Sequence, residues 1–340
     1  MDLLPSAAQL EIVSTASKFI AERMAVEQLR ADRADPLAVR PEVWREGAEM
    51  GLLTLGLPER FGGSGQPFDD EVLLHIELGR RLAPGPFLAG TLAARVGAAC
   101  GDAELAGEIG SGAATVALAI LRGGGEARSV KGTFDLLDWF GARYALVLSR
   151  EGAALVDIAV FGEPTIIESA DPGVRLASAS ATGVEPLYWL PAEKEWIWGR
   201  AVVLASAFLT GLALAAAAES TQHAKTREQF GKPIGANQAI KHSCVDMVVA
   251  AEAAQAQTFF AAIALDSRRD DALWQVLSAL TVAGTAAVEN AAAGIQVFGG
   301  MGYTFESNMH LYLKRSHLFR HLIVEPNEVL AELIMQDRLQ

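Results

Sequence analysis

Residues 226–247 read TREQFGKPIGANQAIKHSCVDM, and with residues 294–315, GIQVFGGMGYTFESNMHLYLKR, they decide the fold. Each segment interrupts a series of long apolar stretches in which small and branched residues recur at three- and four-residue spacing, as they do on helices. Long helices joined by short connections are typical of an antiparallel bundle. We therefore predict a C-terminal four-helix bundle with helices at 201–225, 236–265, 271–298 and 309–323.

The remainder of the chain changes character once. Up to about residue 112 the apolar spacing predicts helices, at 7–23, 41–51 and 69–82. Short β-rich runs then follow at 114–121, 142–149, 153–162 and 164–169, and the triple glycine at 123–125 predicts a turn. The fold class we expect is mainly α with a small β domain, divided into an N-terminal helical domain (1–112), a shortened middle β domain (113–195) and a C-terminal helical bundle (196–340).

Composition restricts the classes of partner. The chain has 28 Lys and Arg against 41 Asp and Glu, a net charge of −13, so its field repels phosphate backbones and anionic lipids. We expect no nucleic-acid partner. Hydrophobic residues make up 51% of the chain, enough for a substantial core.

Cysteine usage and the N-terminus indicate a cytoplasmic protein. Cys100 and Cys244 are far apart and lack metal-site spacing, and the N-terminus lacks the basic start of a secretory signal. The apolar stretch at 201–218 is rich in Ala and has no aromatic belt, so we expect a closely packed buried helix and no membrane span.

The two segments quoted first contain the candidate binding residues. Arg227 can present a planar guanidinium to a pyrophosphate, and Phe230 an aromatic ring to a flat ligand. Gly299 and Gly300 lack side chains, so backbone can approach a bulky dinucleotide, and Gln296 supplies an amide. The alternative is structural: Arg227 pairs with a surface carboxylate, Phe230 lies in the core, and the glycines cap a helix.

With GLLTLGLPERFGGSG at 51–65 and the helix–sheet–helix order, these segments resemble the acyl-CoA dehydrogenase family of flavoproteins. The resemblance covers nearly the whole chain. It implies FAD as cofactor and an acyl-CoA thioester as substrate. In the family, the two segments hold the FAD of a neighbouring subunit. This implies cofactor-binding roles for Arg227, Gln229, Phe230, Asn237, Gln296, Gly299 and Gly300.

The chain departs from the family where the redox-active ring would be held. The Thr-Glu-Pro-Gly-Ala-Gly-Ser-Asp-like loop of the family is absent after the first strand. Leu136 and Asp138 stand where the family has the Trp and Thr that contact the ring. The resemblance therefore implies that this half of the site is eroded.

The catalytic base of the family is also missing. The reaction removes the α proton of the thioester with a carboxylate while hydride leaves the β carbon. The commoner position of that carboxylate falls on Ile323 and the alternative one close to Ala201. Glu325 is a weak candidate. His317, His321 and Glu325 recur every four residues, but we interpret them as a solvated face and expect no metal.

The chain thus resembles the short, active-site-deficient subunit of heteromeric α2β2 actinobacterial acyl-CoA dehydrogenases, including those of steroid side-chain degradation. A longer family subunit would supply the base, and an electron-transferring flavoprotein would accept the electrons. Two alternatives stay open: a self-sufficient homo-oligomeric enzyme with a displaced base such as Glu325, and an inactive interaction protein on the same fold.

Overall fold

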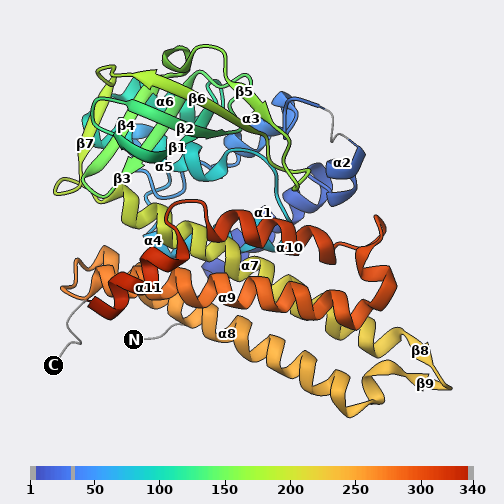
Figure 1. Cartoon of the computed structure of the whole chain (residues 1–340). Coiled ribbons are helices and arrows are strands. Elements are labelled where there is room, and N and C mark those ends of the chain that lie inside the picture. The colour runs from blue at the N-terminus through green and yellow to red at the C-terminus, as the bar shows by residue number, and fades with distance from the viewer. Residues whose placement is uncertain (1–4, 32–34, 336–340) are drawn as a thin grey trace. The chain divides into compact units, whose positions relative to one another are not determined.

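The computed structural model describes residues 5–31 and 35–335, which form two compact units (Figure 1). The sheet unit comprises residues 22–71 and 84–201. The helical unit comprises residues 5–21, 72–83 and 202–335 of the described chain. The fold is that predicted from the sequence, with helical N- and C-terminal parts and a central sheet.

The sheet unit is built around seven strands with the order β5-β6-β2-β1-β3-β4-β7. β1 and β3 are parallel, and the other neighbouring pairs are antiparallel. The strands are β1 (Val116–Glu126), β2 (Lys131–Leu137), β3 (Tyr144–Ser149), β4 (Gly152–Asp157), β5 (Thr165–Ile167), β6 (Leu176–Thr182) and β7 (Tyr188–Pro191). The helices of this unit are α2 (Val26–Ala31), α3 (Pro41–Glu49), α5 (Phe87–Cys100) and α6 (Ala103–Gly110), with the 3-10 turns η1 (Glu59–Phe61) and η2 (Ile158–Phe161).

Both faces of the central strands are buried. On one face alternate residues, among them Phe134 and Leu136, form a core in which the Phe134 and Phe161 rings meet edge to face with centroids 5.2 Å apart. α5 contacts β1, β3, β4 and β7. Central strands buried on both sides need nearly continuous apolar sequence, which explains why their alternation is loose.

Two local predictions for this unit were wrong. The glycines at 123–125 lie inside β1, whose pairing with β2 shifts register between Arg122 and Glu126; the turn itself spans residues 127–130. The run at 153–162 is a strand only to Asp157, because the Asp157 side chain accepts a hydrogen bond of 2.8 Å from the Ala159 N–H and starts η2.

The helical unit contains the helices that the spacing predicted, α1 (Ala7–Arg23), α4 (Phe68–Arg80), α7 (Ile197–Thr226), α8 (Gln238–Asp266), α9 (Ala272–Phe298) and α10 (Met309–Arg320). A further helix, α11 (Pro326–Met335), was not predicted. The first residues of α4 and α7 belong to the sheet unit. A two-stranded hairpin, β8 (Glu228–Gln229) and β9 (Lys232–Pro233), and the 3-10 turn η3 (Ile234–Ala236) connect α7 to α8. A further 3-10 turn, η4 (Gly299–Tyr303), follows α9.

α4 and α7 cross with their backbones in contact. A methyl group placed on Gly79 would lie 2.0 Å from the carbonyl oxygen of Phe208, and one placed on Gly211 would lie 2.0 Å from that of Ile76. Each helix therefore presents a glycine to the backbone of the other. Two helices can approach this closely only where the residue at the contact is glycine, because a Cβ atom would collide with the opposite backbone.

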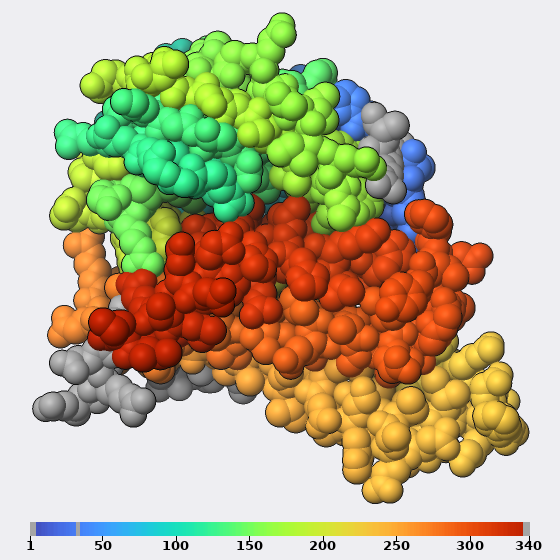
Figure 2. Space-filling model, in the orientation of Figure 1, coloured from blue at the N-terminus to red at the C-terminus, as the bar shows by residue number. Residues whose placement is uncertain are grey.

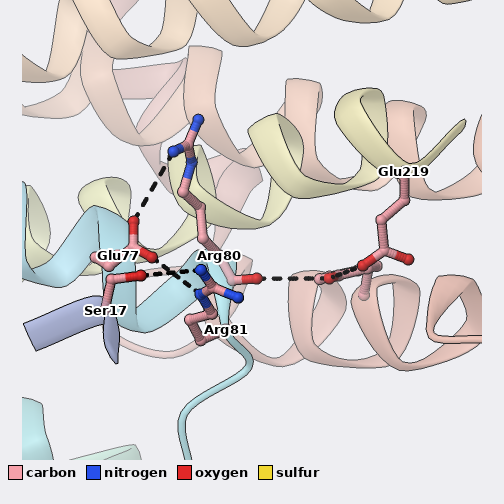
Figure 3. Close-up of polar contacts among 6 residues, drawn as sticks. Ser17, Glu77, Arg80, Arg81 and Glu219 are labelled. Atoms are coloured by element: carbon pink, nitrogen blue, oxygen red, sulfur yellow. Dashed lines mark hydrogen bonds and ion pairs between the residues drawn. The ribbon is translucent and has the colours of Figure 1, made fainter. Parts of the chain in front are cut away.

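A polar network follows this crossing and ties α4 to α1, α7 and α10 (Figure 3). The Glu77 carboxylate accepts a hydrogen bond of 3.1 Å from Arg81 Nε, and Arg81 Nη2 donates to Ser17 Oγ at 2.9 Å. The Tyr312 hydroxyl donates to Glu219 Oε1 at 2.6 Å and lies 3.5 Å from the carbonyl oxygen of Arg80. Burial, together with the Glu219 carboxylate, raises the pKa of Tyr312 well above its ordinary value.

Three stretches, α7, α8 and residues 272–303, are long and apolar enough to cross a membrane by length and composition. Of the most apolar stretch of α7, 89% is buried within the fold. This burial agrees with the prediction that the stretch at 201–218 is a closely packed interior helix.

The glycine crossing predicts a large effect of one methyl group. Gly211→Ala should lower the free energy of unfolding by about 1–3 kcal/mol, because the α4 backbone must move away. Gly107→Ala on α6, where no atom lies within 4 Å of the added methyl, serves as the control and should raise it by about 0.5–1 kcal/mol. Denaturant unfolding measures both, and equal effects of the two substitutions would contradict the role of the crossing.

Candidate functional site

The hairpin between α7 and α8 presents a strained, exposed aromatic residue. Gln229 pairs with Lys232, and the two residues between them, Phe230 and Gly231, have φ of 54° and 77°. Tight hairpin turns with both central residues left-handed match the twist of their strands. A left-handed phenylalanine costs about 1–2 kcal/mol, and here its side chain is 98% exposed, so no packing within the described chain offsets the strain.

A small core fixes the hairpin to the bundle. Ala224 of α7, Cys244 and Met247 of α8, and Val297 of α9 are buried together beneath it, with Ile234 packed against them. The hairpin is also tied to α7 by main-chain hydrogen bonds, from Arg227 N–H to the His223 carbonyl and from Ile234 N–H to the Arg227 carbonyl, both 2.8 Å. Figure 2 shows the hairpin and the start of α8 as a projecting yellow lobe.

An aromatic stack brings the two sequence segments together. The His223 ring, one turn before Arg227, lies against the Phe298 ring with centroids 4.1 Å apart and planes inclined by 13°. Phe298 is the last residue of α9 and immediately precedes Gly299. The segments at 226–247 and 294–315, distant in sequence, therefore meet at one end of the helical unit.

All seven residues assigned to cofactor binding are exposed there: Arg227, Gln229, Phe230, Asn237, Gln296, Gly299 and Gly300. The Gln229 amide nitrogen donates to the Glu228 carbonyl at 2.9 Å. Asn237 is the N-cap of α8 but makes no side-chain cap hydrogen bond. Within the described chain, Arg227 has no carboxylate partner. Its pairing with a surface carboxylate, the structural alternative, is therefore not seen.

The other structural alternatives have mixed outcomes. Phe230 is not a core residue, given its exposure. Gly299 does end α9, with φ of 64°, as a helix cap would. No atom lies within 4 Å of the position of a Cβ at either Gly299 or Gly300, so both leave main chain open to an approaching molecule.

Three exposed apolar residues of this surface escaped the sequence analysis. Met301, Tyr303 and Phe305 are 41%, 74% and 73% exposed and follow the glycines directly. The sequence does contain an indication of them, because bulky apolar residues that follow a glycine pair interrupt the helical spacing. Their exposure, however, depends on the turn η4 and the start of α10, which the spacing alone does not locate.

In the sheet unit the residues at the ring-contact positions face other neighbours. Leu136 is fully buried in the core of the sheet. Asp138, with φ of 52°, exchanges main-chain and side-chain hydrogen bonds with Arg175: its N–H donates to the Arg175 carbonyl at 2.8 Å, and its Oδ1 accepts from the Arg175 N–H at 3.2 Å. The connection from β1 to β2 is the tight turn at 127–130. The strand ends are thus occupied by contacts within the sheet unit.

The candidate base positions also lack a free carboxylate. Ala201 is fully buried in α7, and Ile323 lies between α10 and α11. Glu325 is about half exposed, and its Oε2 lies 2.7 Å from His321 Nδ1. Among residues 5–31 and 35–335, no group of three or more His, Cys, Asp or Glu is arranged to hold a metal ion.

Comparisons with known proteins identify relatives along the whole chain. The family model "Acyl-CoA dehydrogenase, N-terminal domain" matches residues 6–123, and "Acyl-CoA dehydrogenase, C-terminal domain" matches residues 193–337. Acyl-CoA dehydrogenase IpdE2 of Mycobacterium tuberculosis is 32% identical over 322 residues, 94% of each chain.

Two solved structures share the fold. The Tcur3481–Tcur3483 steroid acyl-CoA dehydrogenase variant has a TM-score of 0.84 at 23% identity over 96% of each chain. The ChsE4–ChsE5 complex from Mycobacterium tuberculosis has a TM-score of 0.83 at 21% identity over 100% of each chain.

The stack under the site predicts a pH effect on stability. Burial, and then the nearby Arg227 cation, lower the pKa of His223 below its ordinary value. Folding therefore favours the neutral form of His223. This preference stabilises the fold above the pKa that the histidine has in the unfolded chain, about 6.5, and the stabilisation is lost as pH falls below that value. His223→Phe keeps a ring on Phe298 without the titration. Between about pH 7.5 and about pH 5 it should lose less unfolding free energy than the wild type; an equal loss would contradict this account.

Proposed function

Because the chain belongs to the acyl-CoA dehydrogenase family, we propose that it is a subunit that completes the FAD site of a longer family member and lacks a complete site of its own. The family and its class, an oxidoreductase acting on acyl-CoA, are those predicted from the sequence. The division of the site between two subunits is the proposal.

One observation supports the proposal above the others. The seven residues assigned to cofactor binding, here called the FAD-tail surface, lie exposed at one end of the helical unit, and the strained Phe230 among them is 98% exposed. Leu136, in contrast, fills the core of the sheet where a ring contact would be required. Exposed polar donors around an unpartnered aromatic residue are suited to a partner's ligand.

The residues at this end fit a dinucleotide. Arg227 offers a guanidinium to a pyrophosphate, Gln229, Asn237 and Gln296 offer amides, and the open main chain at Gly299 and Gly300 allows close approach. The Phe230 ring offers a flat apolar face. When bound, FAD supplies the hydride acceptor for α,β-dehydrogenation of the thioester.

The base belongs to the partner in this proposal. Removal of the α proton requires a carboxylate within hydrogen-bond reach, and the two family positions fall on Ile323 and close to Ala201 in this chain. Glu325, the remaining candidate, is exposed and held by His321.

We infer the finer features with support from the structures of similar fold. A heteromeric partner is favoured because ChsE4–ChsE5 is a complex, and a steroid-derived acyl group because the Tcur3481–Tcur3483 protein is a steroid acyl-CoA dehydrogenase. We place the enzyme in the cytoplasm, in keeping with its free Cys100 and Cys244, and assign an electron-transferring flavoprotein as electron acceptor.

Two alternatives predict different behaviour. A self-sufficient homo-oligomer would bind flavin as the single chain and use Glu325. An inactive interaction protein would make no contribution to the flavin of a complex, so substitution of Arg227 would leave flavin occupancy unchanged. The flavin spectrum and native mass of the chain alone, and co-produced with the longer subunit, separate the homo-oligomer from the other two: the proposal requires a colourless chain and a yellow complex whose flavin content depends on Arg227.

Arg227 should be essential for flavin retention. In the complex with the longer subunit, Arg227→Gln should weaken flavin binding by about tenfold to a hundredfold, since a charge-assisted hydrogen bond contributes about 1.5–3 kcal/mol. Lys232→Gln, on the same exposed hairpin, is the matched control and should change it by less than about threefold. Flavin absorbance after dialysis reports occupancy, and native mass shows that the complex persists. Equal losses in the two variants would rule out a specific role for Arg227.

Glu325 should be dispensable for turnover. Glu325→Gln in the complex should keep the wild-type rate within about twofold, because the carboxylate removed is a solvated partner of His321. A loss of turnover by about a thousandfold or more, with flavin content unchanged, would instead identify Glu325 as the base and favour the homo-oligomeric alternative.

A further inference from the structure

A cavity of about 240 Å³ lies within the sheet unit, and none of the residues that line it belongs to the FAD-tail surface. Pockets for drug-sized ligands measure about 300–1,000 Å³, so this cavity suits a smaller molecule. Its wall comes from the segment that leads into α3, from Pro86 before α5, from residues 112–115 between α6 and β1, and from residues 138–141 after β2.

Most of the wall is apolar. It includes the side chains of Pro36, Leu37, Val39, Pro41, Pro86 and Phe140, and the prolines have no N–H to offer. Two polar side chains of the wall already make hydrogen bonds within the unit. Thr115 Oγ1 donates to the Gly141 carbonyl at 3.0 Å, and Asp138 Oδ1 accepts the Arg175 N–H at 3.2 Å.

Trp44 of α3 brings an unused donor to this wall. The residue is only 3% exposed, and its Nε1 N–H has no hydrogen-bond partner within the described chain. The ring is packed against Phe87, with centroids 4.9 Å apart. The edge that carries Nε1 lies beside Gly112, another residue of the wall, because a methyl group placed on Gly112 would be 3.3 Å from Nε1. Buried donors are nearly always paired, so this N–H indicates an acceptor from outside the described chain.

A trapped water is a poor partner for this N–H. A buried water needs about two to four polar partners, and the wall consists mainly of proline, aliphatic and aromatic side chains. An oxygen attached to an apolar body pairs the donor and removes the wall from water at the same time. A carbonyl oxygen suits this position better than a hydroxyl group, because it brings no donor of its own that would need a second partner.

We infer that this cavity binds a small uncharged carbonyl compound, whose oxygen accepts the Trp44 N–H and whose hydrocarbon body lies on the apolar wall. Arg45 also lines the cavity, but it is an exposed residue whose charge water solvates. The bound compound therefore needs no charge. This site goes beyond the proposed role of the chain in holding FAD.

The test compares two probes of the same shape on the full chain. 4′-Fluoroacetophenone carries a carbonyl where 1-ethyl-4-fluorobenzene carries a methylene, and fluorine NMR follows both in titrations. Both should bind saturably, with the ketone about three- to tenfold tighter, the gain expected from one hydrogen bond to a buried donor. Equal affinities, or no saturable binding of the ketone, would overturn the inference. Tighter binding of 4-fluorobenzoate than of the ketone would also overturn it, because the ligand would then be an anion.

Trp44→Phe tests the donor directly. This variant keeps an aromatic ring but lacks the N–H, so the affinities for the ketone and the hydrocarbon should come within about twofold of each other. A general loosening of the fold would weaken both probes and leave their ratio unchanged. A threefold or larger preference for the ketone that persists in the folded variant would contradict the inference; thermal melts establish that the variant is folded.

Variants of the wall locate the probes, and they also serve if Trp44→Phe does not fold. Leu37→Ser should weaken both probes by about five- to tenfold through loss of apolar contact. Leu187→Ser, an exposed leucine of the same unit outside the cavity, should leave both unchanged. Equal effects of the two substitutions would place the probes elsewhere and overturn the inference.

A last variant separates this site from the proposed FAD site. Arg227→Gln should leave the ketone titration of the single chain unchanged. Loss of flavin from the complex with that variant, beside an unchanged ketone titration, shows two independent sites. Weaker ketone binding in Arg227→Gln would instead place the probe on the FAD-tail surface and overturn the inference.

Discussion

The helical unit depends on the contact between the backbones of α4 and α7. Gly79 and Gly211 face carbonyl groups of the opposite helix, where any side chain would force them apart. α7 is 30 residues long, and its far end supports the hairpin, so its packing decides where the exposed arginine and phenylalanine lie. Asn290 of α9 strengthens the arrangement by donating to the carbonyl groups of Ala213 on α7 and Met247 on α8, at 3.1 and 2.8 Å.

The two units differ in what they leave exposed. The end of the helical unit is rich in donors and exposed rings, and it is the surface that we propose for a dinucleotide held partly by another protein. The sheet unit instead uses its strand ends for its own contacts, as the exchange between Asp138 and Arg175 shows.

Sequence spacing predicted the long helices well, because each buries a continuous apolar stripe; α1 begins and ends at the predicted residues. It was weaker where a single side chain decides the outcome. Asp157 converts the end of a strand into a 3-10 turn, and the glycines at 123–125 remain in β1 because β2 still pairs with the strand around them. The bounds of β2, β6 and β7 were not predicted, since strands such as Leu176–Thr182 alternate small residues that have little intrinsic strand preference.

For the site, motifs identified the exposed residues, but the stack of His223 on Phe298 joins residues 75 positions apart and is visible only in three dimensions.

The exposed rings around the hairpin also bear on how such a chain is produced. Phe230, Tyr303 and Phe305 of the helical unit present apolar surface to water, and exposed surface of this kind promotes association with other apolar surfaces. If the chain pairs with a longer subunit as we propose, the unpaired form would tend to aggregate as its concentration rises. Synthesis of the two subunits in matched amounts, and assembly soon after folding, would keep that form scarce.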